Sequence, residues 1–264
     1  MDLEAVRVAF DLRMRRDAPP EGPGSVVERV GDVVRQTGPD ADSWNGVVWS
    51  GLDAAGADAA IAGEVRHFTA LHREFEWKLY AHDRPADLAE RLVAAGFTPG
   101  PPETLMVAEV RQLPTGVRLP EGVELRPVTD AAGVALMTRA HEAAFGEDGS
   151  RIHHQVLTRL ADDPDSMVAM VAMAGDEPVC AARMEFHPGT GFASLWGGGT
   201  APAWRGRGIY RALVAHRTGI AAARGVRLLQ VDASDDSRPI LQRLGFSALT
   251  TTTPHVYRVR DEQG

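Results

Sequence analysis

The chain has 264 residues, a length that suits one large domain or two small ones. Its 44% hydrophobic and 24% charged residues are typical of a globular protein with a sizeable core, which argues against long disordered stretches. The formal net charge is −8; residues 1–115 hold 12 basic against 19 acidic side chains, and residues 116–264 hold 16 against 17. This distribution argues against nucleic acid or an anionic membrane as the main partner.

Cysteine usage and hydropathy restrict the class of protein further. Cys180 is the only cysteine, so no intrachain disulfide can form, and no Cys/His cluster has the spacing of a zinc site. No apolar run approaches the ~20 residues that a membrane-spanning helix needs. The charged, amphipathic N-terminus differs from a signal peptide. We therefore expect a cytoplasmic protein without a bound metal and without a membrane partner.

The first half of the chain predicts alternating strands and helices. In chain order we expect a strand at 45–50, a helix at 57–71, a strand at 75–80, a helix at 86–95 and a strand at 104–110. Pro and Gly are then concentrated between residues 113 and 122, which predicts a linker or a domain boundary.

The second half predicts three strands in tight hairpins, followed by alternating helices and strands. In chain order we expect a strand at 123–128, helices at 131–146 and 150–161, strands at 167–173, 178–187 and 192–199, a helix from 209 that stops at Gly225, a strand at 226–231, a helix that Ser234 caps and that ends before Gly245, and closing strands at 248–252 and 255–259.

The two halves share an order of elements. In each, a tryptophan-bearing strand is followed by a helix, a strand, a helix and a Gly-Phe pair. From Trp49 to Gly96 is 47 positions, and from Trp196 to Gly245 is 49. This similarity predicts an internal repeat, with domains at 1–115 and 120–264. The alternative is two unrelated segments of alternating strands and helices.

The segment from Thr200 to Val214 carries the clearest chemical signal. A strand end leads into Arg205-Gly206-Arg207-Gly208 and then into a helix. The first turn of a helix leaves backbone N–H groups unpaired, and its dipole favours anions. Glycines let a diphosphate approach the main chain, and the arginines add positive charge. The loop therefore predicts a diphosphate site.

Arg205-Gly206-Arg207-Gly208-Ile209 resembles motif A of the GNAT superfamily of N-acetyltransferases, written [Q/R]-x-x-G-x-[G/A]. Thr200-x-Pro202 and Leu244-Gly245-Phe246 are also similar to the family pattern, and the resemblance covers roughly residues 123–259. It implies an α/β fold of the α+β type, with a mixed, mostly antiparallel sheet flanked by helices. The first half resembles a second, degenerate copy that has no arginine in the segment 50–56.

The resemblance implies acetyl-CoA as acyl donor and a primary amine as acceptor, which attacks the thioester directly in a ternary complex. Pantetheine would lie between two splayed strands and bond to the backbone of the first, where Gly197-Gly198-Gly199 suits a bulge. The implied contacts with acetyl-CoA are Gly199, Thr200, Ala201, Arg205, Gly206, Arg207, Gly208, Ile209, Tyr210 and Ser234.

The sequence departs from the family pattern at three positions. Tyr210 stands where motif A ends in Gly or Ala, and Ser234 stands where the family often has Asn. Leu241 replaces the tyrosine that often protonates the leaving thiolate, and leucine has no proton to donate. Tyr257 on a closing strand is a candidate substitute for that acid, and release without an acid is an alternative because a free thiol has a pKa of ~8.5.

Candidate general bases in the second half are Glu185, Glu142, His141 and His187, because an ammonium acceptor must lose a proton before it attacks. Of these we place Glu185 in the predicted catalytic site, with Tyr257. An ordinary surface or turn position is the alternative for each base. Cys180 is predicted to be a small buried side chain, since no neighbour in the sequence would lower its pKa.

Two other classes of function are weighed against acyl transfer. A non-catalytic acyl-CoA-binding or regulatory module would explain Leu241 and the degenerate first half. A domain for NAD or a nucleoside triphosphate is disfavoured, because no Gly-Lys-Ser/Thr follows the loop and antiparallel hairpins precede it.

Overall fold

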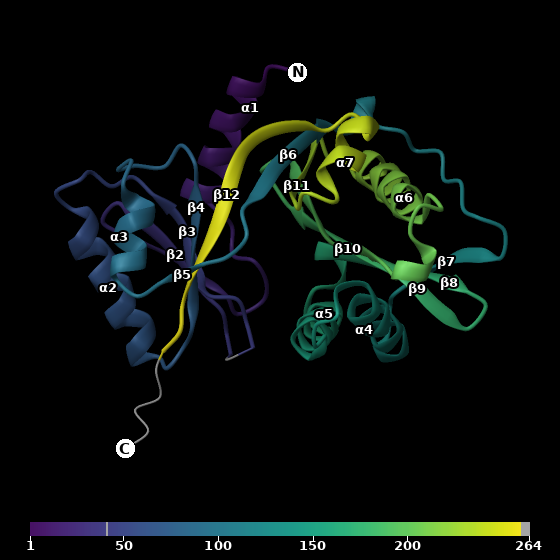
Figure 1. The fold of residues 1–264 in the computed structure, drawn as a ribbon, viewed down its shortest axis with the longest axis horizontal. Helices are drawn as coiled ribbons and strands as arrows, with labels where there is room; N and C mark the ends of the chain where they lie inside the picture. The colour runs from purple at the N-terminus through teal and green to yellow at the C-terminus, as the bar shows by residue number, and fades with distance from the viewer. Residues whose placement is uncertain (41, 260–264) are drawn as a thin grey trace. The chain divides into compact units, whose positions relative to one another are not determined.

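Two compact units make up the part of the chain that the computed structural model describes, residues 1–40 and 42–259 (Figure 1). Unit 1 contains residues 1–105, 232–235 and the described residues from 249 onward; unit 2 contains residues 106–231 and 236–248.

Unit 2 has a mostly antiparallel sheet in the order β6-β11-β10-β9-β8-β7. The pairs β7–β8, β8–β9 and β9–β10 are antiparallel, and β10–β11 is parallel. The strands are β6 (Glu103–Glu109), β7 (Val123–Pro127), β8 (Met167–Ala174), β9 (Glu177–His187), β10 (Phe192–Thr200) and β11 (Leu228–Ala233).

Helices cover both faces of this sheet (Figure 1). Along β8 and β9 the side chains alternate: Val171 and Ala181 pack with the helices α4 and α5, whereas Cys180 and Ala182 pack with α6. The helices are α4 (Ala131–Phe145), α5 (Ser150–Asp162), α6 (Ile209–Ala223) and α7 (Arg238–Leu244), with 3₁₀ turns at η2 (Val110–Gln112), η3 (Pro164–Ser166) and η4 (Pro202–Trp204).

Unit 1 has the strand order β1-β2-β3-β4-β12, with β5 paired to β12. Its only parallel pair in the described ranges is β3–β4. An aromatic core that includes Phe68, Phe75, Trp77 and Phe97 holds the unit together. Its elements are α1 (Leu3–Phe10), a π-helical turn η1 (Asp11–Arg16), β1 (Val26–Val30), β2 (Val33–Thr37), β3 (Gly46–Ser50), α2 (Ala57–Ala70), β4 (Phe75–Tyr80), α3 (Leu88–Ala94), β5 (Thr98–Pro99) and β12 (Ser247–Tyr257).

The internal repeat is confirmed. Unit 1 runs β1-β2-β3-α2-β4-α3, and unit 2 runs β8-β9-β10-α6-β11-α7. The parallel pairing ends at Val47 in unit 1 and at Ser194 in unit 2. In both units a tryptophan follows two residues later, so the repeat extends to matching positions. The predicted mixed, mostly antiparallel sheet flanked by helices is confirmed with it.

Three details differ from the sequence expectation. The two closing strands form one strand, β12, which continues through Pro254. Helix α7 begins at Arg238 with Ser237 as N-cap rather than Ser234, because Pro239 in its first turn sets the helical geometry there. The elements α1, β1 and β2 lacked a clear pattern and were not predicted.

The last strand groups with unit 1, although the sequence boundary between 115 and 120 would place it in the second domain. Residues 252–257 of β12 pair with β4 in an antiparallel register, so the pairing partner decides the grouping. None of the described helices has both the length and the apolar character that a membrane span requires.

Candidate functional site

Strands β10 and β11 separate after a short parallel contact. Phe192 to Ser194 pair with Leu228 to Gln230, and no described pair follows. β10 nevertheless continues to Thr200. Its edge beyond Ser194 therefore presents backbone N–H and C=O groups that β11 does not take up, which is the arrangement an extended ligand can bond to.

A bulge interrupts β10 where the strands separate, as the glycine run predicted. The register with β9 shifts between Trp196 and Gly199, and Gly197 has a φ of +59°. A Cβ at Gly198 would lie 2.6 Å from the Tyr210 ring, and one at Gly199 would lie 2.8 Å from the Ala144 Cβ. Both positions therefore need glycine, because side chains of α4 and α6 pack directly on the strand backbone.

The predicted phosphate loop connects β10 to α6. Gly206 and Gly208 adopt the left-handed conformation, with φ of +77° and +85°, and Gly208 is the N-cap of α6. Open space surrounds Gly206, since a Cβ there would meet no atom within 4 Å. The first-turn N–H groups of α6 have no intrahelical acceptor, so they face a space that an anion can enter.

The arginines of the loop have different roles. Arg205 donates to the backbone oxygens of Thr200 at 3.1 Å and Ala144 at 2.9 Å, so its side chain joins the end of β10 to the end of α4. Arg207 lies over the Trp204 ring at 4.5 Å. Arg211 lies beside Gly208. Arg207 and Arg211 therefore supply the charge next to the free amides, whereas the Arg205 guanidinium braces the loop.

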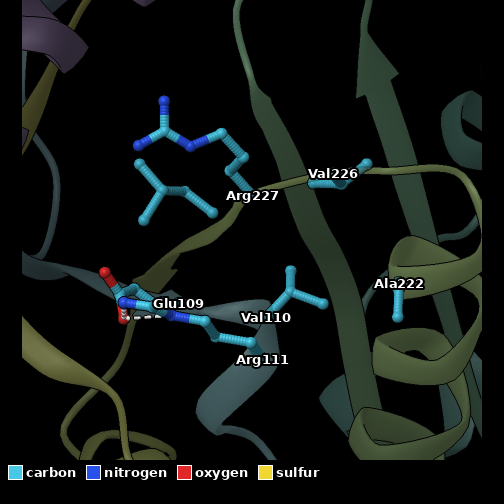
Figure 2. Close-up of a pocket in the computed structure, with 7 residues that line it drawn as sticks. Glu109, Val110, Arg111, Ala222, Val226 and Arg227 are labelled. Carbon is cyan, nitrogen blue, oxygen red and sulfur yellow. Dashed lines mark hydrogen bonds and ion pairs between the residues drawn. The ribbon is translucent and has the colours of Figure 1, made fainter.

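A pocket of about 360 Å³ lies elsewhere in unit 2, between η2, the start of β11 and the last turn of α6 (Figure 2). Arg111 and Glu109 form an ion pair at its wall. Ala222 in that wall is 14 residues after Gly208. At 1.5 Å per helical residue the pocket is about 20 Å from the loop, so it is a separate feature.

On the α4/α5 face, β9 and α5 bring charged groups together near the bulge. Glu185 Oε1 accepts a hydrogen bond from Arg183 Nε at 2.9 Å. Arg159 Nη2, on α5, lies 3.5 Å from Glu185 Oε2. The Arg183 side chain reaches the bulge, 3.5 Å from the Cβ position of Gly197. Because two guanidinium groups contact its carboxylate, Glu185 anchors Arg183 at the bulge.

Next to this group lies a buried polar chain that the sequence did not reveal. His187 Nε2 lies 2.6 Å from Ser194 Oγ, which also accepts from Gln230 Nε2. In the sheet, Ser194 of β10 pairs with Glu185 of β9 and with Gln230 of β11. The side chains of Ser194, Glu185 and Gln230 therefore lie on the same face, which α4 and α5 cover. The period-two pattern of β9 indicated the face, but only the register brings these side chains together.

His141 is the candidate base whose surroundings best suit proton transfer. Its ring lies 4.7 Å from that of Phe145, one turn along α4, and Phe145 packs on Gly199. Burial lowers the pKa of His141, the nearby Arg183 lowers it further, and Glu147 and Glu142 oppose the shift. Within the described ranges the imidazole makes no hydrogen bond. It is therefore neutral near pH 7 and free to accept a proton.

The other candidate bases are engaged in local contacts. Glu142 accepts from the Gly149 backbone N–H at 3.2 Å and so holds the α4–α5 turn. Burial lowers the pKa of His187, whose ring is engaged with Ser194.

The remaining predicted site residues are spread over both units. Ile209 is the first residue of α6. Its side chain is buried in the core between α6 and the sheet, so only its backbone faces the loop. Leu241 is fully buried. Ser234 and Tyr257 group with unit 1, where the Tyr257 ring lies 5.3 Å from Phe97 in the aromatic core.

Cys180 gives a testable consequence of this packing. Burial raises its pKa to about 11, its side chain is 0% exposed, and its sulfur lies 3.1 Å from Thr200 Oγ1. At pH 8 only about 0.1% would be thiolate. We expect iodoacetamide to alkylate the native chain about 100-fold more slowly than the urea-unfolded chain. Equal rates, measured by intact mass, would contradict the buried position.

The corresponding positions of unit 1 are filled by its own side chains. Asp53 Oδ1 accepts from the N–H groups of Ala55 and Gly56 at the start of α2, at 3.0 and 2.7 Å, where a phosphate would bind in a functional copy. Arg15 Nε donates at 3.1 Å to the backbone oxygen of Val48 in the splayed part of β3. In unit 1 these contacts occupy backbone groups whose counterparts in unit 2 are open.

Comparison with known proteins agrees with this geometry. Residues 133–246 match the sequence pattern of the Acetyltransferase (GNAT) family. Among proteins with curated descriptions, none matches the chain.

Solved structures share the fold over nearly the whole chain. A GCN5-related N-acetyltransferase from Kribbella flavida has a TM-score of 0.70 at 20% identity and covers 97% of this chain and 95% of its own. A tandem GNAT protein from the clavulanic acid biosynthesis pathway has a TM-score of 0.61 at 14% identity, with 98% and 89% covered. A GCN5-related N-acetyltransferase from Sphaerobacter thermophilus has 0.59 at 17% identity, with 87% and 81% covered. These similarities establish a fold of two GNAT-like units.

Proposed function

We propose that the protein is an N-acetyltransferase that moves an acetyl group from acetyl-CoA to a primary amine, because residues 133–246 match the Acetyltransferase (GNAT) family. Unit 2 carries the reaction, and unit 1 binds no acyl donor. One observation carries the proposal above the others: the free edge of β10, its bulge and the open loop Arg205–Gly208 follow one another along the chain.

These features fit the parts of acetyl-CoA in order. The amides of residues 206–210 and the charges of Arg207 and Arg211 suit the diphosphate. The β10 edge at residues 198–201 suits the two amide groups of pantetheine, which bond as an added strand does. In this proposal the thioester lies at the bulge, next to the face that carries His141 and Arg183.

The chemistry follows from these positions. The neutral amine attacks the thioester carbonyl, the C–N bond forms, and His141 accepts the proton that the nitrogen loses. The C–S bond then breaks and CoA leaves as thiolate, which takes up a proton. Glu185 keeps Arg183 at the bulge, where its guanidinium stabilises negative charge on the carbonyl oxygen.

Thermal unfolding in the presence of acetyl-CoA, CoA, NAD or ATP tests the binding site. A ligand at 100 times its Kd stabilises the native state by about 2.7 kcal/mol, which raises Tm by about 5–10 °C for a chain of this size. We expect this rise with acetyl-CoA and CoA alone, and a stoichiometry of one per chain by calorimetry. Equal stabilisation by NAD or ATP, or two tight CoA sites, would contradict the proposal.

A charge reversal locates the site. Arg207→Glu places a carboxylate next to the amides of the loop, and a tenfold loss of affinity would halve the shift in Tm. Arg118→Glu is the matched control. It changes the net charge equally, at an exposed arginine in the segment between η2 and β7. We expect the control to keep the full shift.

A non-catalytic acyl-CoA-binding module is the second candidate, and the burial of Leu241 favours it. The two functions differ in turnover. Thiol release from acetyl-CoA is measured with polyamines, aminoglycosides and peptides with free N-termini. Release above the hydrolytic background with any of these amines would reject the binding module.

A further inference from the structure

Tyr210 stands at the meeting point of the loop, the bulge and α6. The proposed reaction, on which this inference rests, releases a thiolate that needs a proton near neutral pH. Leu241 is fully buried and has no proton to give. A tyrosine hydroxyl near the bulge can supply the proton instead.

The backbone of β10 fixes the position of the Tyr210 ring. Its Cε2 and Cζ lie 2.6 and 3.6 Å from the Cβ position of Gly198, so the edge of the ring occupies the space that glycine leaves free. Gly198 is the residue next to the bulge on the α6 face. The hydroxyl therefore lies within a few ångströms of the strand edge at which the thioester is placed.

The hydroxyl is available as a donor. Within the described ranges Tyr210 makes no hydrogen bond, and its oxygen is not sealed off from solvent. Burial raises the pKa of Tyr210, which keeps the phenol protonated; Arg217 opposes this shift, and Cys180 of β9 adds to it. The group facing it from α6 is thus a guanidinium and the group facing it from β9 is a neutral thiol.

Arg217 is an unusual neighbour. It is 1% exposed, and its guanidinium donates to the backbone oxygens of Leu213 at 3.2 Å and Arg183 at 2.8 Å. No described carboxylate pairs with it. A buried cation without an anionic partner stabilises negative charge that forms nearby, here a phenolate.

We propose that Tyr210 is a catalytic residue that donates its phenolic proton to the departing CoA sulfur. As the C–S bond breaks, the sulfur keeps the electron pair and takes the Tyr210 proton, so CoA leaves as a thiol and Tyr210 as a phenolate next to Arg217. The phenolate then regains a proton from solvent, and the proton on His141 is lost to solvent.

The test uses CoA alone and so does not depend on the acceptor. The thiolate of bound CoA absorbs in the ultraviolet, and its pH titration gives the pKa of the bound thiol. A phenol that hydrogen-bonds the sulfur stabilises the thiolate. We therefore expect Tyr210→Phe, which keeps the ring, to weaken the ionisation of bound CoA about tenfold, a rise of about one pKa unit.

The chain has three tyrosines, so each can be compared. Tyr80→Phe is the matched control in unit 1, and Tyr257→Phe tests the competing candidate. Of the three tyrosine variants, we expect only Tyr210→Phe to move the titration. Gly198→Ala is a second variant, because its Cβ displaces the ring of an intact tyrosine; it should move the titration in the same direction.

The outcomes separate the two proposals. If CoA binds but Tyr210→Phe and Gly198→Ala leave the titration unchanged, or if Tyr257→Phe alone moves it, the role of Tyr210 is overturned and the acetyltransferase proposal stands. If wild type does not bind CoA, both are overturned.

Discussion

Replacing Arg15 with alanine is expected to lower the free energy of unfolding by about 3–5 kcal/mol. Arg15 is 2% exposed, and its Nη2 donates to both carboxylate oxygens of Asp83 at 2.7 Å. It also contacts Asp11 at 2.8 Å and lies over the Tyr80 ring at 4.0 Å. Without Arg15, the buried Asp83 carboxylate loses its charged donor and retains the Tyr80 N–H, and the Val48 carbonyl loses the Arg15 donor. Urea unfolding measures the loss.

Two comparisons separate this network from a general effect of losing a cation. Arg16→Ala removes an exposed arginine from the same turn and should change stability by less than about 0.5 kcal/mol. Arg15→Ala combined with Asp83→Ala removes both charges and should cost less than the two single changes together, because no buried charge is left unpaired. A loss below about 1 kcal/mol for Arg15→Ala would contradict the role of the network.

The Arg15 network also explains the different fates of the two repeats. In unit 2 the edge of β10 and the loop amides are free for a ligand. In unit 1 Arg15 takes the carbonyl of Val48, and Asp53 takes the amides at the start of α2. In unit 1, contacts within the protein occupy the positions that are open in unit 2. This difference, rather than the missing arginines alone, supports the proposal of one acyl donor per chain.

Local patterns predicted most elements because they depend on neighbouring residues. The period-two alternation of β8 to β10 and the 3.6 period of α6 gave their bounds to within a residue or two. The glycine run predicted the bulge, since glycine readily adopts the positive φ of Gly197. The packing of α4 and α6 that excludes a Cβ at Gly198 and Gly199 could not be seen in the sequence. The repeat was visible because both copies kept their tryptophan and their Gly-Phe pair.

Features that depend on pairing between distant segments could not be predicted. Nothing local shows that β12 pairs with β4, so the grouping of Tyr257 with unit 1 could not be predicted. Ser234 was assigned to the site from the family resemblance, and it also groups with unit 1. Arg205 fitted the phosphate pattern, yet its guanidinium bonds to the end of α4, 61 residues earlier in the sequence. The contacts between Glu185 and its arginines likewise require the docking of α5 on β9.

Replacing His141 with glutamine is expected to lower kcat about 100-fold near pH 7, the typical contribution of a general base. Glutamine keeps a polar side chain of similar reach but does not titrate. The Kd for CoA should stay unchanged, because His141 lies on the α4/α5 face and the loop contacts lie at the start of α6. The rate is measured as thiol release with saturating acetyl-CoA and an amine on which the wild type turns over.

The pH dependence distinguishes a base from a residue that only packs against Phe145. The neutral imidazole accepts the proton, so kcat falls as pH drops through the pKa of His141. Burial lowers that pKa, so this acidic limb should lie below the ordinary value of about 6.5. In His141→Gln this acidic limb of the pH profile should disappear.

His216→Gln is the matched control. Burial lowers the pKa of His216 in the same direction, but His216 lies on α6, which covers the opposite face of the sheet. A limb that persists in His141→Gln, or a loss of rate that is equal in both variants, would assign the proton transfer to another group.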